Sequence, residues 1–487
     1  MAWGFYGRSA EQEQLAGILS RGRFSFVQVT GRRRIGKTTL VQRVLPRDRR
    51  RFYVQLPDSA PTGILSAIHD AHELFGLDET EFPRPRNLQQ AARFLGSLVR
   101  AGFVVAVDEF QFLARKPLAE LPSALQTEVD TLLREGERAP GTLIVLGSVH
   151  TEMAQLLEDR AAPLYNRTTD QIHVGHLDFA ALKELLTAHG GCDPSRLLFL
   201  WTLFEGVPKF YRDAFEQQVL DDPGVDRRRF LRRMFFDSSS PLRTEADNWF
   251  LKELRGRYDV VLKYVARHPG CSQADLVAHV KNLSPETDDQ VGGYIKVLAE
   301  RFAMIERRLP MFARREARLG RYYLTDNFLR AWLAALAQPV QAQAFRPVEE
   351  LVVEADARLA DVEGHALEKM VAGLVEERGR RGLGPVRMTE HVKGYWDRAG
   401  IEIDFVARDD DTRSLWLGSC RRSPDKLVAA ARALDGHASR LLLGRPDLGG
   451  FKLVKLAFAP TIGPDTCEGL HALGHVPLSI DALLVGL

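Results

Sequence analysis

A chain of 487 residues is too long for one hydrophobic core, and a usual size of about 150 residues per domain predicts about three domains. The hydrophobic fraction of 45% and charged fraction of 27% are typical of a soluble globular protein, and a net charge of only +2 requires any nucleic-acid surface to be local. We find neither a secretory signal at the amino terminus nor an apolar run near the roughly 20 residues of a membrane helix, so we expect no membrane association.

The first part of the chain alternates short apolar strands with amphipathic helices, which is the pattern of a parallel sheet flanked by helices. Three stretches are apolar on both faces and are typical of fully buried strands: 24–30, 103–110 and 141–147. Two stretches between them have helical spacing: 38–45 and 87–102. We therefore expect an α/β core over residues 1–177, followed by a helical segment over 178–240.

A glycine-rich loop follows the first strand and carries the spacing G-x-x-x-x-G-K-T within "VTGRRRIGKTTL". Gly31 and Gly36 let the backbone wrap so that successive N–H groups point at phosphate oxygens. Lys37 would place a positive charge beside the β- and γ-phosphates, and Thr38 would offer its hydroxyl to Mg²⁺. Together with Thr39, these residues predict a site for ATP and Mg²⁺. The three arginines inside the loop, 32–34, form either a solvated rim or a contact to phosphate or to a partner.

A pair of acids follows the second apolar strand, in "FVVAVDEFQ". Asp108 would hold Mg²⁺ through water, and Glu109 would act as the general base that polarises the attacking water. Such a pair is common when taken alone, but together with the phosphate loop it predicts hydrolysis of ATP and not binding only.

Polar residues near the end of the third apolar strand complete the predicted catalytic set. Ser148, with His150 nearby, either senses the γ-phosphate and orients water or caps the helix that follows. Arg167 and Arg160 each either stabilise transition-state charge, in cis or from a neighbouring copy, or form a surface salt bridge.

Downstream, residues 246–336 have the outline of a winged helix-turn-helix. Two short helices separated by Pro269 and Gly270 precede a third helix, and a basic ribbon ends at "RYYLTD". Over 337–361 the apolar pattern weakens and prolines interrupt it, so we predict a linker there. Mixed helix and strand return over 362–487. The four cysteines are far apart and form no CxxC pair, which predicts reduced thiols in a cytoplasmic protein and no zinc site: Cys192, Cys271, Cys420 and Cys467.

The ribbon is rich in arginine and could bind the phosphates of double-stranded DNA without reading its sequence: Arg307, Arg308, Arg314, Arg315, Arg318 and Arg321. The third helix argues against DNA binding, because its first turns are acidic and only Lys296 could reach bases or phosphates. Packing against the ATPase or against a partner is the alternative role for this region.

Five segments taken in order resemble the archaeal-type ATPases of the AAA+/STAND group: "FYGRSAEQEQL", "GRRRIGKTTL", "AVDEFQ", "GSVHTEMAQLLEDRAAPLYNRT" and "EGVPKFY". By this resemblance Gly7 and Arg8 lie near the nucleotide base, Glu11 caps that region, and Gly206 and Pro208 of a helical lid contact the nucleotide. The resemblance also implies that a winged helix follows, and that a domain related to PD-(D/E)xK nucleases closes the chain.

In such nucleases a helix acid, a strand-end aspartate and an E-x-K on the next strand gather Mg²⁺. The corresponding residues here are Glu368, Asp404 with Glu402 two positions earlier, and then Ser419, Cys420 and Arg421 in place of the E-x-K. A hydroxyl is a poor substitute for a carboxylate on Mg²⁺, and arginine lacks the compact ammonium of lysine. We therefore expect a nuclease-like fold that has lost its metal site, the alternative being cleavage with Glu402 as the missing acid.

These observations predict an ATP-hydrolysing switch with a P-loop AAA+-like core, a helical lid, a winged helix and an α/β nuclease-like domain. Three roles remain open: a DNA-associated regulator, an ATP-gated nuclease, and a nucleotide-controlled scaffold for an unknown protein partner. A homo-oligomer is compatible with all three, since a neighbouring copy could supply an arginine to the site.

Overall fold

The structure is a computed structural model that describes residues 2–45, 50–148, 150–222, 224–245, 257–283, 290–314 and 316–487. These residues form two compact units. The P-loop unit consists of Arg8–Leu177 with Val207–Lys209, and the C-terminal unit consists of the described residues of 2–7, 178–206 and 210–487. The segments that we predicted as a lid, a winged helix and a nuclease-like domain therefore share one compact unit.

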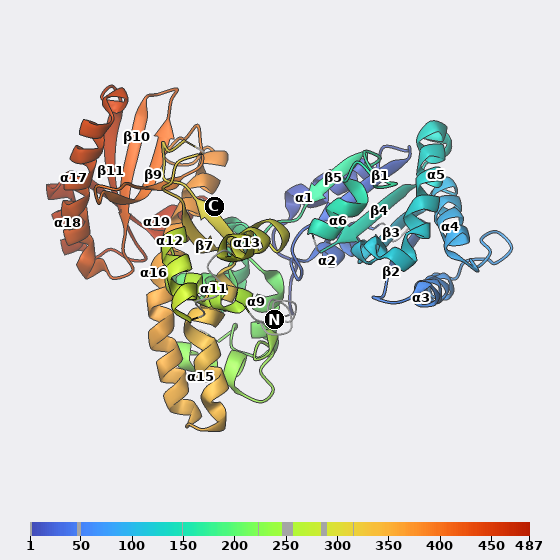
Figure 1. Ribbon diagram of the computed structural model, residues 1–487, viewed down its shortest axis with the longest axis horizontal. Coiled ribbons are helices and arrows are strands. Elements are labelled where there is room, and N and C mark those ends of the chain that lie inside the picture. The colour runs from blue at the N-terminus through green and yellow to red at the C-terminus, as the bar shows by residue number, and fades with distance from the viewer. Residues whose placement is uncertain are drawn as a thin grey trace. The chain divides into compact units, whose positions relative to one another are not determined.

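The P-loop unit is built on a five-stranded sheet with the order β2-β3-β4-β1-β5, in which every pair is parallel (Figure 1). Its strands are β1 (Ser25–Thr30), β2 (Arg51–Gln55), β3 (Val104–Asp108), β4 (Thr142–Gly147) and β5 (Asp170–His173). Its main helices are α1 (Ser9–Leu19), α2 (Lys37–Val44), α3 (Pro61–Leu74), α4 (Leu88–Arg100), α5 (Glu120–Glu135) and α6 (His150–Leu157). The α/β core and the three buried strands expected from the sequence are confirmed.

Both faces of this sheet are buried, which explains why its strands lack a polar face. One face packs alternate strand residues, among them Phe26, Val105 and Leu143, against α3, α4 and α5. The intervening residues, such as Val27 and Ile144, are fully buried on the other face. The carboxyl ends of parallel strands share one edge of a sheet, so Asp108, the last residue of β3, lies at the same edge as Gly31 and Ser148, which directly follow β1 and β4.

The C-terminal unit begins with helices over the region expected to be helical. They are α7 (Phe179–Ala188), α8 (Pro194–Phe204), α9 (Pro208–Glu216), whose first two residues belong to the P-loop unit, α10 (Arg227–Leu231) and a π-helical turn η4 (Arg232–Phe236). Three further helices and a two-stranded antiparallel ribbon follow: α11 (Arg257–Arg267), α12 (Gln273–Leu283), α13 (Val291–Lys296), β6 (Ile305–Arg308) and β7 (Arg321–Leu324). Residues 284–289, at the acidic start of the expected third helix, lie outside the described residues.

The linker predicted over 337–361 is wrong. After α14 (Asn327–Ala331) and the π-helical turn η8 (Trp332–Leu336), this segment forms α15 (Ala337–Gln341) and the first turns of the 33-residue helix α16 (Val348–Arg380). Pro347 is the N-cap of α16, so this proline starts a helix where we expected it to interrupt the chain. Buried Leu351, Ala355 and Leu359 recur at a spacing of four and fix one face of α16 against the unit.

The unit ends in a five-stranded mixed sheet with the order β12-β11-β10-β9-β8 (Figure 1). Its strands are β8 (Lys393–Trp396), β9 (Glu402–Asp409), β10 (Ser414–Cys420), β11 (Lys452–Ala459) and β12 (His475–Ser479), with α17 (Leu427–Gly444), α18 (Pro464–Ala472) and α19 (Ile480–Leu484). The β8–β9 and β9–β10 pairs are antiparallel, and the remaining two pairs are parallel.

In the described part of the chain, no helix combines the length and apolar composition required to cross a membrane. The four cysteines of that part, Cys192, Cys271, Cys420 and Cys467, form no disulfide with one another.

Candidate functional site

The phosphate loop joins β1 to α2 and has the backbone that its two glycines allow. Gly31 lies so close to the carbonyl oxygen of Val174 that a β-carbon on it would stand 2.3 Å from that oxygen. Gly36 has a φ of +94° and is the N-cap of α2, so it supplies the left-handed turn that starts the helix. The loop therefore ends on a helix N-terminus, whose free N–H groups and dipole favour an anion.

Lys37 is only 7% exposed and lies folded under the loop. Its ammonium donates hydrogen bonds of 2.9 Å to the carbonyl oxygens of Gly31 and Arg32. Burial lowers the pKa of Lys37 to about 8, although Asp108 and Glu109 favour its charged form. A buried cation bonded only to neutral carbonyls is suited to exchange them for the oxygens of a phosphate.

Asp108 connects three elements at the carboxyl edge of the sheet and is 3% exposed. Its Oδ2 accepts hydrogen bonds from the hydroxyl of Thr38 at 2.6 Å and from the hydroxyl of Tyr53 at 2.9 Å. Its Oδ1 accepts from the backbone N–H of Glu109 at 2.8 Å. Burial, followed by the charge of Asp108, raises the pKa of Tyr53 above its ordinary value, so Tyr53 remains a donor. The hydroxyl and the carboxylate proposed for Mg²⁺ are thus already in contact.

Glu109 stands at the N-cap of a short 3₁₀ helix, η1 (Phe110–Ala114), with a φ of +56°. Its carboxylate accepts a hydrogen bond from the side-chain amide of Gln111. The same amide lies 3.3 Å from the hydroxyl of Ser148 and accepts a 3.3 Å hydrogen bond from the Ser148 N–H. The structure therefore brings the predicted base and the predicted sensor together through Gln111. The side chain of His150 lies outside the described residues.

Arg8 is a clamp beside the phosphate loop. Its guanidinium binds the carbonyl oxygens of Ile35 at 3.3 Å and Gly175 at 2.5 Å, and pairs with Glu11 at 2.9 Å. Only 6% of the Arg8 side chain is exposed, so these donors are committed to the protein. This geometry favours a structural role for Arg8 over the contact with the nucleotide base that the resemblance implies.

For four other predicted nucleotide contacts, the structure gives the position in the chain but no side-chain interaction that would decide whether they bind the nucleotide. Gly7 has a φ of +62° and is the last residue before the chain enters the P-loop unit at Arg8. Gly206 is the last residue before the chain enters the P-loop unit a second time, at Val207. Pro208 belongs to that short segment and is the first residue of α9. Thr39 is exposed on the first turn of α2. Nucleotide contact by these residues stays a prediction.

Arg167 has a protein partner. Its guanidinium binds both carboxylate oxygens of Asp130 on α5, at 2.7 and 3.1 Å. The structure therefore shows the salt-bridge alternative, and Arg167 would have to leave Asp130 before it could reach a phosphate. Arg160 is exposed just beyond α6.

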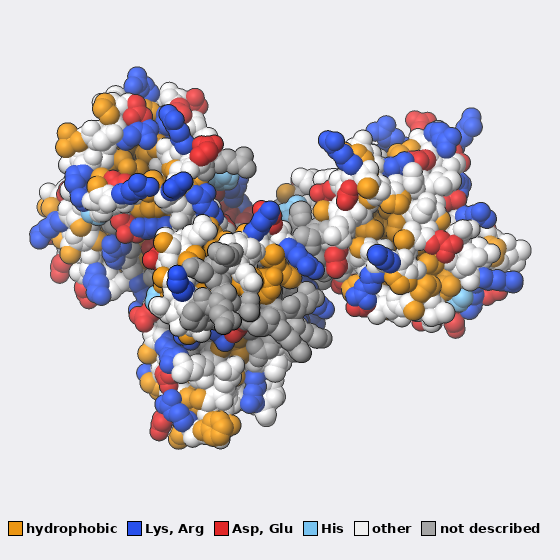
Figure 2. All heavy atoms as spheres, viewed as in Figure 1, with side chains coloured by type: hydrophobic (Ala, Val, Ile, Leu, Met, Phe, Trp, Pro, Cys, Tyr) orange, Lys and Arg blue, Asp and Glu red, His pale blue; other side chains and the backbone are white. Residues whose placement is uncertain are grey.

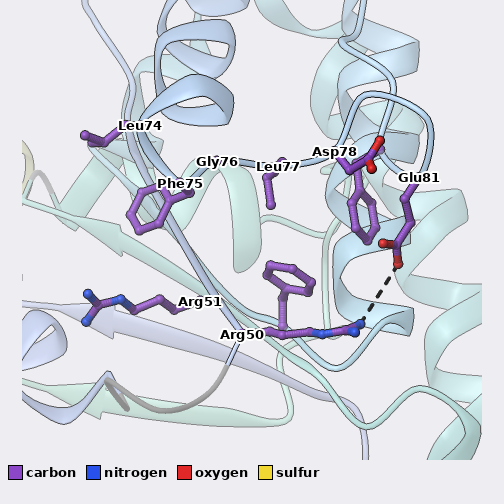
Figure 3. A pocket seen from close by; sticks show the side chains of 10 residues that line it. Arg50, Arg51, Leu74, Phe75, Gly76, Leu77, Asp78 and Glu81 are labelled. Carbon is purple, nitrogen blue, oxygen red and sulfur yellow. Dashed lines mark ion pairs between the residues drawn. The ribbon is translucent and has the colours of Figure 1, made fainter.

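A separate pocket of about 750 Å³ lies at the opposite edge of the same sheet (Figure 3). Arg50 and Arg51 reach it from the start of β2, and apolar side chains reach it from the end of α3 and from Phe103 before β3. Arg50 stacks on the Phe103 ring at 5.6 Å and pairs with Glu81 at 4.0 Å. Because phosphates are bound at the carboxyl edge of such sheets, this pocket is not the nucleotide site.

The basic ribbon packs against the C-terminal sheet of its own unit. Met311 in the loop of the ribbon is fully buried in the core of that sheet, and its N–H binds the carbonyl oxygen of Gly394 at 2.9 Å. Arg321 pairs with Glu402 at 2.7 Å and stacks on Trp396 at 4.6 Å. Packing was the alternative that we gave to DNA contact for this region, and the contacts of the ribbon within its own unit are to β8 and β9.

The other ribbon arginines divide into two groups. Arg307 donates to the carbonyl oxygen of Ala317 at 2.7 Å, and Arg308 pairs with Glu306 and stacks on Tyr323. Arg314 and Arg318 are exposed, whereas Arg315 lies outside the described residues.

On the visible face of the P-loop unit, basic and acidic side chains are interspersed, and no single basic field covers it (Figure 2).

Three residues that we predicted for a degenerate nuclease site, Glu368, Asp404 and Arg421, lie close together. On β9, Asp404 accepts from Arg421 at 2.6 Å and from the Cys420 N–H at 2.9 Å, while Glu368 on α16 pairs with His365 at 3.1 Å. Burial and the charge of Glu368 raise the pKa of Asp404, against the effect of Arg421. Ser419 is 4% exposed, and its hydroxyl has no hydrogen-bond partner among the described residues.

Glu402 pairs with Arg321 at 2.7 Å, and its side chain is 59% exposed. Its role as the missing acid stays a prediction. Within the described part of the chain, no three His, Cys, Asp or Glu side chains are grouped closely enough to hold a metal ion. The cation beside Asp404 is the guanidinium of Arg421. The loss of the metal site stays a prediction.

Reasoning from the sequence missed two residues of the candidate site, Tyr53 and Gln111. Gln111 stands two positions after Glu109, and its burial to 2% exposure could not be read from the pattern. Tyr53 lies on the edge strand β2, and only the parallel pairing of β2 with β3 brings it to Asp108. For Tyr53 the available signal was its place between Arg51 and Gln55 on the polar face of a strand whose other face has Phe52 and Val54.

Comparisons with known proteins agree with this fold. No family model matches the chain. A curated but uncharacterized protein of Methanocaldococcus jannaschii is 24% identical over 417 residues, which is 85% of this chain and 86% of that protein. Among solved structures, the Walker-type ATPase of Pyrococcus abyssi is similar with a TM-score of 0.50 and 18% identity over 68% of this chain and 96% of that one. The ORC2 protein of Aeropyrum pernix is similar with a TM-score of 0.44 and 15% identity, over 73% of this chain and 94% of that one. The first of these structural similarities supports the fold of a P-loop ATPase for this chain.

Proposed function

We propose that the protein binds ATP with Mg²⁺ and hydrolyses it at the carboxyl edge of the P-loop sheet. The observation that carries this proposal is the 2.6 Å hydrogen bond between Thr38 and Asp108, with buried Lys37 in the loop beside them. A hydroxyl and a carboxylate held together beside a buried lysine are the parts that P-loop enzymes use for the metal and the terminal phosphates.

The residues present fit Mg²⁺, because Thr38 and Asp108 offer the hard oxygen atoms that this ion prefers. When bound, the ion would neutralise the charge that develops on the phosphate oxygens. Lys37 would exchange its two carbonyl partners for phosphate oxygens, and the N–H groups at the start of α2 would bind the same phosphates. Glu109 would orient the attacking water and accept its proton.

The test is ATP hydrolysis by the purified full-length protein with Lys37→Ala and Glu109→Gln. Hydrolysis by the wild type that is abolished by both substitutions supports the proposal. Matched controls are Lys116→Ala and Glu120→Gln, which make the same changes at exposed positions of the same unit. A wild type that releases no phosphate from ATP, or a rate unaffected by Lys37→Ala, contradicts it.

A second function, association with double-stranded DNA, is favoured by the exposure of Arg314 and Arg318 on the ribbon. Exposed arginines can neutralise phosphates and add salt-dependent, sequence-independent affinity. The test is to add DNA to the ATPase assay across a salt series. A rate of ATP hydrolysis that DNA raises at low salt, and raises less as the salt concentration increases, would show that DNA binding and ATP hydrolysis are coupled. A rate of ATP hydrolysis that does not change when DNA is added would favour a protein partner.

For the C-terminal domain we propose a scaffold role and not nuclease activity. The carboxylate of Asp404 is held by Arg421 and by the Cys420 N–H, in a geometry that supplies a protein cation where a nuclease needs a metal ion. A partner protein that co-purifies in only one nucleotide state supports the scaffold role. A complex that forms equally in every nucleotide state counts against it.

A further inference from the structure

Gln111 is a buried amide that joins two strand ends of the P-loop unit. It is 2% exposed and lies in η1, directly after β3. Its Nε2 donates to the carboxylate of Glu109 and to the hydroxyl of Ser148, and its Oε1 accepts from the Ser148 N–H. One side chain therefore holds both a residue at the end of β3 and a residue at the end of β4.

The space around this amide is closed. A β-carbon on Gly147, the last residue of β4, would stand 2.2 Å from Sδ of Met153 and 3.0 Å from Oε1 of Gln111. Glycine at this position thus admits Met153 and the amide together. Phe110, which precedes Gln111 in the chain, is 1% exposed. A side chain confined in this way holds its hydrogen-bond partners in one arrangement.

The chemistry of the three groups gives this arrangement a use. Both hydrogens of an amide nitrogen are needed to bind Glu109 and Ser148 at once. If Ser148 moved to contact a terminal phosphate, its hydrogen bonds to Gln111 would change. The hydrogen bond from Gln111 to the carboxylate of Glu109, which must orient water, would then change as well. Since a general base acts only from the correct position, the orientation of Glu109 governs the rate.

We propose that Gln111 is a positioning residue that couples Ser148 to Glu109 during ATP hydrolysis. This inference rests on the proposed ATPase function and adds to it a route by which the end of β4 controls the base at the end of β3. Gln111 acts through Glu109 and need not contact the nucleotide.

The experiment is a double-mutant cycle with Gln111→Met and Ser148→Ala, measured as kcat, KM and nucleotide Kd. Gln111→Met keeps the length of the side chain but removes its hydrogen bonds. We expect it to lower kcat about tenfold, less than the roughly 10²-fold for losing a general base, because Glu109 itself remains, with Kd unchanged. Ser148→Ala should lower kcat in the wild type and add less than about twofold in the Gln111→Met background, because coupled residues are not additive.

A matched control is Gln28→Met on β1, which removes another amide that is 2% exposed, bonded to Glu158 at 3.3 Å. It should leave kcat unchanged. Gln111→Asn, one methylene too short to bridge the two groups, should reproduce Gln111→Met and provides the cycle if the methionine variant does not fold. Additive effects of Gln111 and Ser148, or a loss confined to KM, overturn the coupling alone. A wild type without ATPase activity overturns the proposed function and this inference with it.

Discussion

The hydroxyl of Thr38 donates to Oδ2 of Asp108 over 2.6 Å, and this contact joins the start of α2 to the end of β3. Tyr53 donates to the same oxygen, so the orientation of the carboxylate is set before any ligand arrives. A metal site whose oxygen atoms are already in place loses little conformational entropy when the ion binds. Nucleotide and Mg²⁺ should therefore bind without rearrangement of Asp108.

Thr38→Ala should lower kcat for ATP hydrolysis by about 10²-fold, because it removes one oxygen ligand from the charge-neutralising ion. Thr38→Ser keeps the hydroxyl and is the matched control, with activity within about threefold of the wild type. The measurement is initial rate against Mg²⁺ concentration. Equal rates for the alanine and serine variants would show that the Thr38 hydroxyl does not serve the metal.

Lys37 makes nucleotide affinity depend on pH. Its pKa is lowered by burial to about 8, so the free protein carries a charged Lys37 below pH 8 and a neutral one above it. Phosphate oxygens favour the charged form and raise this pKa when they bind. Binding of ATP should therefore take up a proton above pH 8, and affinity should fall there by up to about tenfold per pH unit.

Calorimetry in two buffers of different ionisation enthalpy measures this proton directly. We expect proton uptake at pH 8.5 that vanishes at pH 6.5, with Lys37→Ala showing weak binding and no uptake at either pH. Affinity that stays constant from pH 7 to pH 9 would contradict a lowered pKa for Lys37.

Local chemistry of the candidate site was readable from the sequence, and its cross-strand contacts were not. The glycine spacing and the acidic strand end located Lys37, Asp108 and Glu109, because each function depends on residues close together in the chain. Tyr53 reaches Asp108 only through the pairing of β2 with β3. Strand order is a property of the whole sheet, so no short window of sequence contains it.

The same distinction applies to the C-terminal unit. The charge of the ribbon arginines was readable from the sequence, but the burial of Met311, in the ribbon loop, within a core formed mostly by β9, β10 and α17 was not. For α16, Pro347 was read as an interruption although proline is favoured at a helix start. The apolar face of α16 contains small residues such as Ala355 and Ala366, which weakens its periodic signal in a hydropathy pattern.

DNA binding through the ribbon has a measurable signature. The double variant Arg314→Ala with Arg318→Ala removes two exposed charges and should reduce the slope of log affinity against log salt by about 1.8, since each phosphate contact contributes about 0.9. Arg432→Ala with Arg440→Ala removes two exposed charges from α17 and serves as the control. An unchanged slope for the ribbon variant, measured by fluorescence anisotropy, would place any DNA contact elsewhere.

The C-terminal site should bind no divalent cation. Arg421 already neutralises Asp404, and a hydroxyl stands at Ser419 in place of a third carboxylate. In the absence of nucleotide we expect no bound Mn²⁺ by paramagnetic resonance, and no cleavage of DNA or RNA with either Mg²⁺ or Mn²⁺. One Mn²⁺ per chain that disappears in Asp404→Ala would instead establish a retained metal site.

The buried carboxylate of Glu363 on α16 should be a major determinant of the stability of the C-terminal unit. It is 1% exposed, and it binds Arg227 from α10 at 2.5 Å and Arg422, two residues beyond β10. Glu363→Gln removes the anion that these two guanidinium groups share, but Arg227 keeps Asp356 and both arginines are partly exposed, so it should cost about 1.5 kcal/mol of unfolding free energy. Glu349→Gln breaks a pair on the same helix, but its side chain is 72% exposed, so it should cost less than about 0.5 kcal/mol. Chemical denaturation of the two variants separates these cases, and equal midpoints would mean that α16 is held by its apolar face alone.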